Sequence, residues 1–214
     1  MIRHYHAIRE AAQHIAGAIN RSVDAIRDGR VEQEPAMTDR MLGKVEEALD
    51  NYRAKGICWS AKTLTDRGGG AQETRYGADF MGVLNISLPD FNVAKGFLAQ
   101  AKLIRADRTI NLKELKGQCE KMLNLSPDSF VFLYSPNDVR VVPALSIVAS
   151  HADPIELYSR SAQRFFEEHF ECFIGDRNIS APDSATLKNL SARYEARRTL
   201  LLQARPDDET NRSD

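Results

Sequence analysis

The fold of this chain is decided by two neighbouring apolar stretches, Gly77-Ala78-Asp79-Phe80-Met81-Gly82-Val83-Leu84-Asn85-Ile86-Ser87 and Ala94-Lys95-Gly96-Phe97-Leu98-Ala99-Gln100-Ala101-Lys102-Leu103-Ile104. Both are rich in strand-forming residues, and a Pro-Asp-Phe-Asn turn at residues 89–92 lies between them. Because side chains i and i+2 of a strand share a face, Gln100 and Lys102 should project together, with Ala101 on the other face. A carboxylate from Asp79 on the neighbouring strand would complete a site for a hard metal ion beside an ammonium group.

Outward from these strands, hydrophobic periodicity and turn residues predict the remaining elements. Before them we expect an amphipathic helix over 2–28, a polar loop holding Pro35, a helix from its N-cap Thr38 to about Arg53, and a strand over 56–64 that runs into a flexible turn at 66–71. After them we expect a helix over 111–123, strands over 130–134 and 139–142, a helix beginning at Asp153-Pro154, and a helix over about 184–203. The chain should therefore be an α/β protein.

Composition narrows the class of protein without naming its activity. With 214 residues, 43% of them apolar, the chain can bury a substantial core, and its net charge of −1 gives no sign of a polyanionic partner. No apolar run is long enough to span a bilayer, and the N-terminus lacks a signal-peptide layout. The three cysteines are far apart and are expected to be reduced. We expect a cytoplasmic protein.

The expected elements divide the chain into four parts. We expect an N-terminal helical extension over residues 1–37, a core that holds the candidate metal site over 38–150, C-terminal helices that pack on the core over 151–204, and a disordered tail over 205–214. The last helix is expected to be a satellite or an oligomer contact.

In element order and motif the sequence resembles the PD-(D/E)xK nuclease superfamily. The resemblance rests on the residues Glu73-Thr-Arg-Tyr-Gly-Ala-Asp79 and Gly96-Phe-Leu-Ala-Gln100-Ala-Lys102, and it covers roughly residues 38–145. The nearest branch is that of Mrr-like enzymes in which Gln-x-Lys replaces Glu-x-Lys. It implies a restriction endonuclease-like mixed central sheet flanked by helices, with extra helices here at both ends. A second Glu-x-Lys pattern, Glu114-Leu115-Lys116, lies on a predicted helix, where side chains i and i+2 diverge.

The resemblance implies an Mg²⁺- or Mn²⁺-dependent phosphodiester hydrolase, an endonuclease with DNA as the expected substrate. Asp79 would be the anionic metal ligand, Gln100 would ligate through its amide oxygen or orient a bound water, and Lys102 would orient or deprotonate the attacking water. With Gln in place of an acid, a second carboxylate becomes more necessary. Two candidates remain open: Glu46, on the helix before the first strand, and Glu73, which matches a recurring Glu of the Gln-x-Lys branch.

The segment 91–121 carries seven Lys or Arg against three Asp or Glu, which suits contact with a phosphate backbone. We expect Lys95, Arg105 and Gln118 to contact nucleic acid.

Three hypotheses about the biological role follow. The first is a nuclease effector of a bacterial antiviral defence or DNA-repair system. The second is a catalytically impaired nucleic-acid-binding or assembly module of the same fold, which the Gln at position 100 motivates. The third is an oligomerisation role for the flanking helices. No separate target-recognition domain is evident, so specificity would come from the extra helices, a homodimer or a partner protein.

Overall fold

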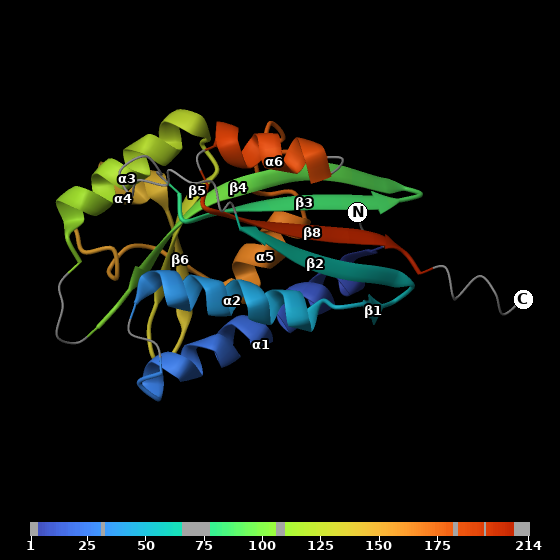
Figure 1. Cartoon of the computed structure of the whole chain (residues 1–214), viewed down its shortest axis with the longest axis horizontal. Coiled ribbons are helices and arrows are strands. Elements are labelled where there is room, and N and C mark those ends of the chain that lie inside the picture. Colours follow the sequence, from blue (N-terminus) through green and yellow to red (C-terminus); the bar gives the residue numbers. More distant parts are fainter. Residues whose placement is uncertain are drawn as a thin grey trace, which may run out of the picture.

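The computed structural model describes residues 4–30, 33–65, 78–105, 110–181, 184–194 and 196–207. This part of the chain is an α/β protein with six helices and one eight-stranded mixed sheet (Figure 1). The helices are α1 (Tyr5–Arg27), α2 (Glu34–Ala48), α3 (Leu112–Leu125), α4 (Ala144–Ala149), α5 (Ala162–Phe170) and α6 (Ser184–Arg193). The strands are β1 (Tyr52–Ala54), β2 (Ile57–Thr65), β3 (Phe80–Leu88), β4 (Phe91–Leu103), β5 (Ser129–Tyr134), β6 (Val139–Pro143), β7 (Arg160–Ser161) and β8 (Arg198–Pro206).

The sheet is built around the β3–β4 hairpin. Its strand order is β1-β2-β8-β3-β4-β5-β6-β7. Strands β3 and β4 are antiparallel, β4 and β5 are parallel, and the last strand in sequence, β8, inserts between β2 and β3, parallel to β3. The C-terminal end of β4 therefore lies beside the N-terminal end of β3, and the N-terminal end of β8 lies on the other side of β3.

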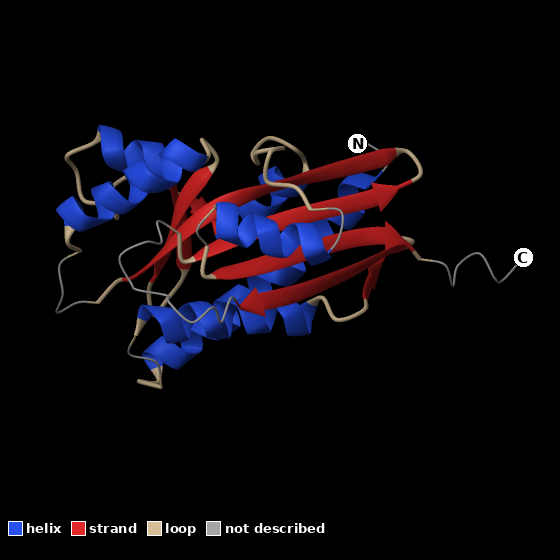
Figure 2. Cartoon of the chain, turned by 45° about the horizontal axis from the view of Figure 1, so that its top comes forward, coloured by secondary structure: helices blue, strands red, loops and turns tan. Residues whose placement is uncertain are grey.

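Each face of the sheet has its own hydrophobic core. Helices α1, α2 and α5 cover one face, where their apolar side chains meet those of alternate strand residues such as Phe80, Ala101 and Phe132. Helices α3, α4 and α6 cover the other face and pack on Met81, Val131 and their neighbours. Figure 2, turned from the first view, shows α6 lying across the strands on this second face. Because successive side chains of a strand point to opposite faces of the sheet, neighbouring strand residues belong to different cores.

Several predicted elements are confirmed. The expected first helix is α1, the strand over 56–64 is β2, and the two deciding stretches are β3 and β4. The expected helix over 111–123 is α3, and the two strands that follow it are β5 and β6. None of the described helices is long and apolar enough to cross a membrane.

The predicted start of α2 was wrong. The helix begins at Glu34, with Pro35 in its first turn, rather than after an N-cap at Thr38. Proline is tolerated there because the first N–H groups of a helix have no intrahelical acceptor. The Thr38 hydroxyl instead donates to the Glu34 carbonyl, 3.0 Å away. At the other end the helix stops at Ala48, and residues 52–54 are strand β1.

Two predictions for the C-terminal part were also wrong. Asp153-Pro154 starts a turn, in which the Asp153 carboxylate accepts from Ile155 N–H at 3.0 Å, and α5 begins only at Ala162. The helix expected over 184–203 ends at Arg193, and residues 198–206 are strand β8. Leu, Ala and Gln favour helix, but burial between two strands overrides that preference.

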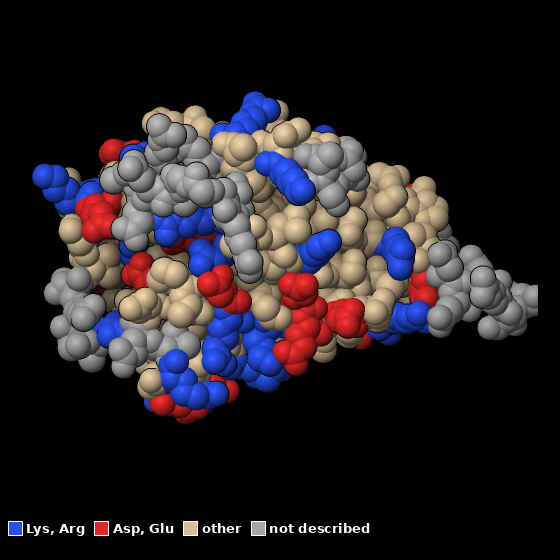
Figure 3. All heavy atoms as spheres, viewed as in Figure 1, with Lys and Arg blue, Asp and Glu red and all other residues tan. Residues whose placement is uncertain are grey.

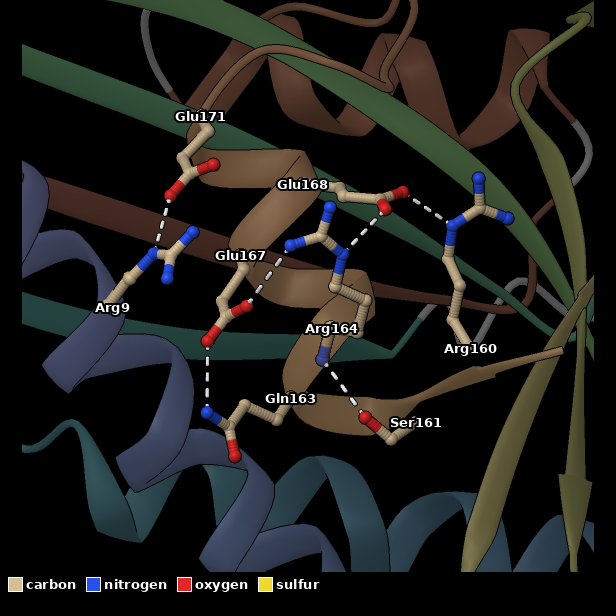
Figure 4. Close-up of polar contacts among 8 residues, drawn as sticks. All are labelled: Arg9, Arg160, Ser161, Gln163, Arg164, Glu167, Glu168 and Glu171. Atoms are coloured by element: carbon tan, nitrogen blue, oxygen red, sulfur yellow. Dashed lines mark hydrogen bonds and ion pairs between the residues drawn. The ribbon is translucent and has the colours of Figure 1, made fainter.

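The buried carboxylates on α5 and at its C-cap form ion pairs and hydrogen bonds with neighbouring side chains. Figure 4 shows Glu168 between two guanidinium groups, with Arg160 Nε at 2.5 Å and Arg164 Nε at 2.8 Å. Glu171 accepts from Arg9 of α1 at 2.9 Å, and Glu167 accepts from Gln163 at 2.9 Å. Because each buried acid has a partner, this cluster attaches α5 to α1 and β7 and has a structural explanation.

Candidate active site

The β3–β4 hairpin brings Asp79 and Gln100 into direct contact. The Asp79 Oδ2 atom accepts from Gln100 Nε2 at 2.6 Å and from the backbone N–H of Ala101 at 2.9 Å. The backbone N–H of Asp79 donates to the Ala99 carbonyl at 2.8 Å, which fixes the residue at the end of the hairpin. Two of the three residues singled out in the sequence therefore meet.

Gln100 and Lys102 share a face of β4. Their partners on β5 are Val131 and Leu133, both in the core covered by α3, α4 and α6, whereas Ala101 belongs to the opposite core. Gln100 is only 4% exposed. The Lys102 side chain is 13% exposed. The site therefore lies mostly below the surface, at the end of β4.

Lys102 is paired with a carboxylate from α2. Its Nζ atom lies 3.2 Å from Glu34 Oε2, and Glu34 Oε1 accepts from the backbone N–H of Leu103 at 3.3 Å. Glu34 is the first residue of α2, so the start of this helix reaches the end of β4. The structure thus brings four side chains into one group: Asp79, Gln100, Lys102 and Glu34.

The electrostatics of Asp79 combine burial with nearby charge. Burial raises the pKa of its carboxyl above the ordinary value, and the negative charge of Glu34 acts in the same direction. The hydrogen bond from Ala101 N–H and the positive charges of Lys102 and Arg197 oppose this rise. An added cation would therefore favour the ionised carboxylate, which is what a cation site requires.

Arg198 of β8 holds the first turns of α2 in place. Its guanidinium forms a two-pronged ion pair with Asp39, in which Nη2 lies 2.9 Å from Oδ2 and Nε contacts Oδ1. The same Nη2 also donates to the Pro35 carbonyl at 3.5 Å. Arg198 is only 9% exposed, and such bidentate pairs fix geometry as well as charge. The position of Glu34 over Lys102 therefore depends on β8.

Glu46 and Glu73, the two predicted second acids, are not part of this group. Glu46 lies near the C-terminal end of α2, where its carboxylate accepts from the backbone N–H of Thr63 at 3.1 Å. Glu73 lies outside the described residues. The carboxylate that α2 brings to the site is Glu34.

The three predicted nucleic-acid contacts lie in different environments. Lys95 is 2% exposed, and its ammonium donates to the Ile174 carbonyl at 2.6 Å. It is therefore not part of a surface that a polymer could contact. Arg105 is half-buried two residues after β4. Gln118 is half-buried on α3, and its amide oxygen is buried without a hydrogen-bond partner among the described residues.

Charge on the surface is mixed rather than concentrated. Figure 3 shows Lys and Arg interspersed with Asp and Glu around α2 on the face viewed, without a continuous positive stripe over the part of it that the structure describes. The basic excess of segment 91–121 is also dispersed, because Lys95 is buried and Lys102 is paired. Binding of a polyanion would depend on cations close to the site.

The residue types at the site fit a divalent metal ion of the Mg²⁺ class. Asp79, Glu34 and Gln100 offer hard oxygen donors, and Mg²⁺ commonly uses one or two carboxylates and completes its shell with water and substrate phosphate. Among the described residues, no three His, Cys, Asp or Glu side chains lie close enough together to hold a metal ion by themselves. Gln100 and substrate oxygens would therefore have to contribute.

Sequence reasoning missed Glu34, Arg197 and Arg198. A signal for Glu34 was present, since Glu followed by Pro is a frequent start of a helix. No local signal pointed to the two arginines, because they reach the site only through the insertion of β8 into the sheet.

Comparison with known proteins adds no family. No protein-family model matches the chain, and neither a curated protein nor a solved structure was found to be similar to it.

Proposed function

We propose that the protein is a metal-dependent nuclease of the restriction endonuclease-like fold, with Asp79, Gln100, Lys102 and Glu34 as its active site. The observation that carries this proposal is the 2.6 Å contact of Asp79 with Gln100 across two strands, with Lys102 on the same face of β4. An acid, an amide and an amine side by side at the end of a hairpin match what the Gln-x-Lys motif requires.

Each side chain has a role in phosphodiester hydrolysis. Asp79 and the amide oxygen of Gln100 would hold a divalent cation, which supplies Lewis-acid stabilisation of the phosphate. Gln100 Nε2 donates to Asp79 in this structure, so the amide would turn to present its oxygen to the cation. Lys102 orients the attacking water, accepts its proton when deprotonated, or offsets charge on the phosphate oxygens when protonated. Glu34 holds the Lys102 side chain and adds a second carboxylate beside it. DNA is the expected polymer, and a role as effector of a defence or repair system is part of the proposal.

The direct test is cleavage by the full chain. Supercoiled plasmid DNA and a labelled single-stranded RNA are incubated with the protein in Mg²⁺, in Mn²⁺ and in EDTA. We expect metal-dependent nicking or linearisation of the DNA and no reaction in EDTA. If neither polymer is cut with either metal, the nuclease proposal is refuted.

One alternative has a specific observation in its favour. The described residues provide only two carboxylates at the site, and Gln100 stands where many nucleases of the superfamily have an acid. A nucleic-acid-binding or assembly module without catalysis would show tight, metal-independent binding and no product in the same assay.

Exchange for glutamine separates the roles of Glu34 and Glu46, which lie at opposite ends of α2. We expect Glu34→Gln to reduce the initial cleavage rate by about 10- to 100-fold, because Lys102 loses its charge partner and the site loses a carboxylate. Glu46→Gln, on the same helix, should leave the rate within about 2-fold, since Glu46 contacts only the β2 backbone in the described structure. Rates are measured over a Mg²⁺ titration. If the two changes reduced the rate equally, the role proposed for Glu34 would be refuted.

A further inference from the structure

The segment just before strand β8 places an arginine directly beside Asp79. Ala196 bridges to Ala78 in parallel fashion, and Thr199 is the partner of Met81, so the same register continues through both segments. Between these pairs, Arg197 is the lateral neighbour of Asp79. Neighbouring strands lie about 4.8 Å apart, which keeps the two residues within reach of each other.

Arg197 and Asp79 begin a row of laterally neighbouring residues, which continues across the β3–β4 hairpin. Phe80 is paired with Ala99, and Asp79 contacts Gln100. Arg197, just before β8, Asp79, just before β3, and Gln100 of β4 therefore lie side by side, and Lys102 is two residues further along β4 on the same face as Gln100. Arg197 is half-buried, and its charge acts on the Asp79 carboxyl.

The neighbouring arginine has a different partner. Arg198 turns to α2 and is held there by Asp39 and Pro35. The two successive arginines thus serve different parts of the site: Arg198 positions the helix that carries Glu34, while Arg197 lies in the row that contains Asp79.

We propose that Arg197 binds a phosphate of the substrate strand beside Asp79. This inference rests on the proposed nuclease function and adds to it a substrate-binding residue supplied by the segment just before β8. A guanidinium presents two parallel N–H donors to two phosphate oxygens, so it suits a phosphodiester better than an ammonium group does. Lys102 is paired to Glu34, and Arg197 adds a second cation whose charge acts at Asp79.

The test compares Arg197→Ala, Arg197→Lys and Arg205→Ala in the full chain. Arg205 is the matched control, because it is an exposed arginine on β8, eight residues and about 25 Å further along the chain. Binding of a fluorescent DNA duplex is measured by anisotropy in Ca²⁺ over a series of NaCl concentrations, and cleavage is measured in Mg²⁺.

We expect Arg197→Ala to weaken binding about 10-fold, to lower kcat/KM for cleavage by about 100-fold, and to reduce the slope of log K against log salt by about one. Arg197→Lys should restore the salt slope but only part of the cleavage rate, since lysine cannot bind bidentately. Arg205→Ala should behave as the native protein does. Melting temperatures of all three should match that of the native chain.

The outcomes distinguish the two levels of the proposal. If the native protein neither binds nor cuts DNA, the nuclease function itself fails. If the native protein cuts and Arg197→Ala has native affinity, salt slope and kcat/KM, the role of Arg197 is overturned and the nuclease function stands. Loss of activity in Arg197→Lys as well as in Arg197→Ala, with an unchanged salt slope, would likewise overturn it, because it would indicate a structural role.

Discussion

Replacement of Asp79 by asparagine or of Lys102 by alanine is expected to reduce metal-dependent cleavage by about 10²- to 10⁴-fold while the protein stays folded. Asparagine keeps the size of Asp79 and an oxygen for the Ala101 N–H, but it removes the charge that attracts a cation. Alanine at 102 removes the only amine that the described structure places next to Asp79 and Glu34. Initial rates on plasmid DNA in Mg²⁺ measure both effects.

The stability of these variants should not follow their activity. Burial raises the pKa of Asp79, so the folded state disfavours its charged form, and a neutral amide relieves that cost. We therefore expect the melting temperature of Asp79→Asn to equal or exceed that of the native protein. A catalytic group held at a cost to stability behaves in this way.

The second Glu-x-Lys pattern supplies the control. Glu114-Leu115-Lys116 lies on α3, where Glu114 belongs to the N-terminal cap of the helix, with its N–H donating to Asn111. Lys116→Ala removes the same type of side chain from the same three-residue spacing and should leave cleavage within about 2-fold. Cleavage at the native rate by Asp79→Asn and Lys102→Ala together would end the assignment of this site.

The elements that could be predicted are those with local signals. Alternation and turn chemistry predict the β3–β4 hairpin, and the spacing of Gln100 and Lys102 predicts their common face. The contact between Asp79 and Gln100 follows from the same hairpin, because an antiparallel pair joined by a short turn has little freedom of register. The central part of the site could therefore be predicted from about 30 residues of sequence.

The remaining parts depend on contacts distant in sequence. The placement of the first turns of α2 against the sheet depends on Arg198, which lies more than 150 residues away and binds Pro35 and Asp39. The segment Thr199-Leu-Leu-Leu-Gln-Ala204 has the composition of a helix, and it becomes a strand because β2 and β3 flank it on both sides. No local pattern records such a partner.

Removal of β8 is expected to abolish folding of the whole domain. A chain that ends at Tyr194 would lack the strand that joins β2 to β3, so the sheet would divide into β1–β2 and β3–β7, each with an unpaired edge. It would also lose Leu200 and Leu202, which are 1% and 0% exposed. Truncation of one buried leucine costs about 2–5 kcal/mol, and a typical domain is stable by only about 5–15 kcal/mol. Circular dichroism and thermal denaturation should show no cooperative transition.

Three further changes make this expectation specific to β8. A chain that ends at Asp207 keeps the strand and should melt as the full chain does. Leu202→Ala keeps every backbone hydrogen bond of β8 and should lower the free energy of unfolding by about 2–5 kcal/mol, while Gln203→Ala, one residue on and exposed, should change it by less than about 0.5 kcal/mol. A chain that ends at Tyr194 also lacks Arg197 and Arg198. If it folded cooperatively and still cut DNA, that result would contradict both the central place of β8 in the sheet and the dependence of the site on this segment.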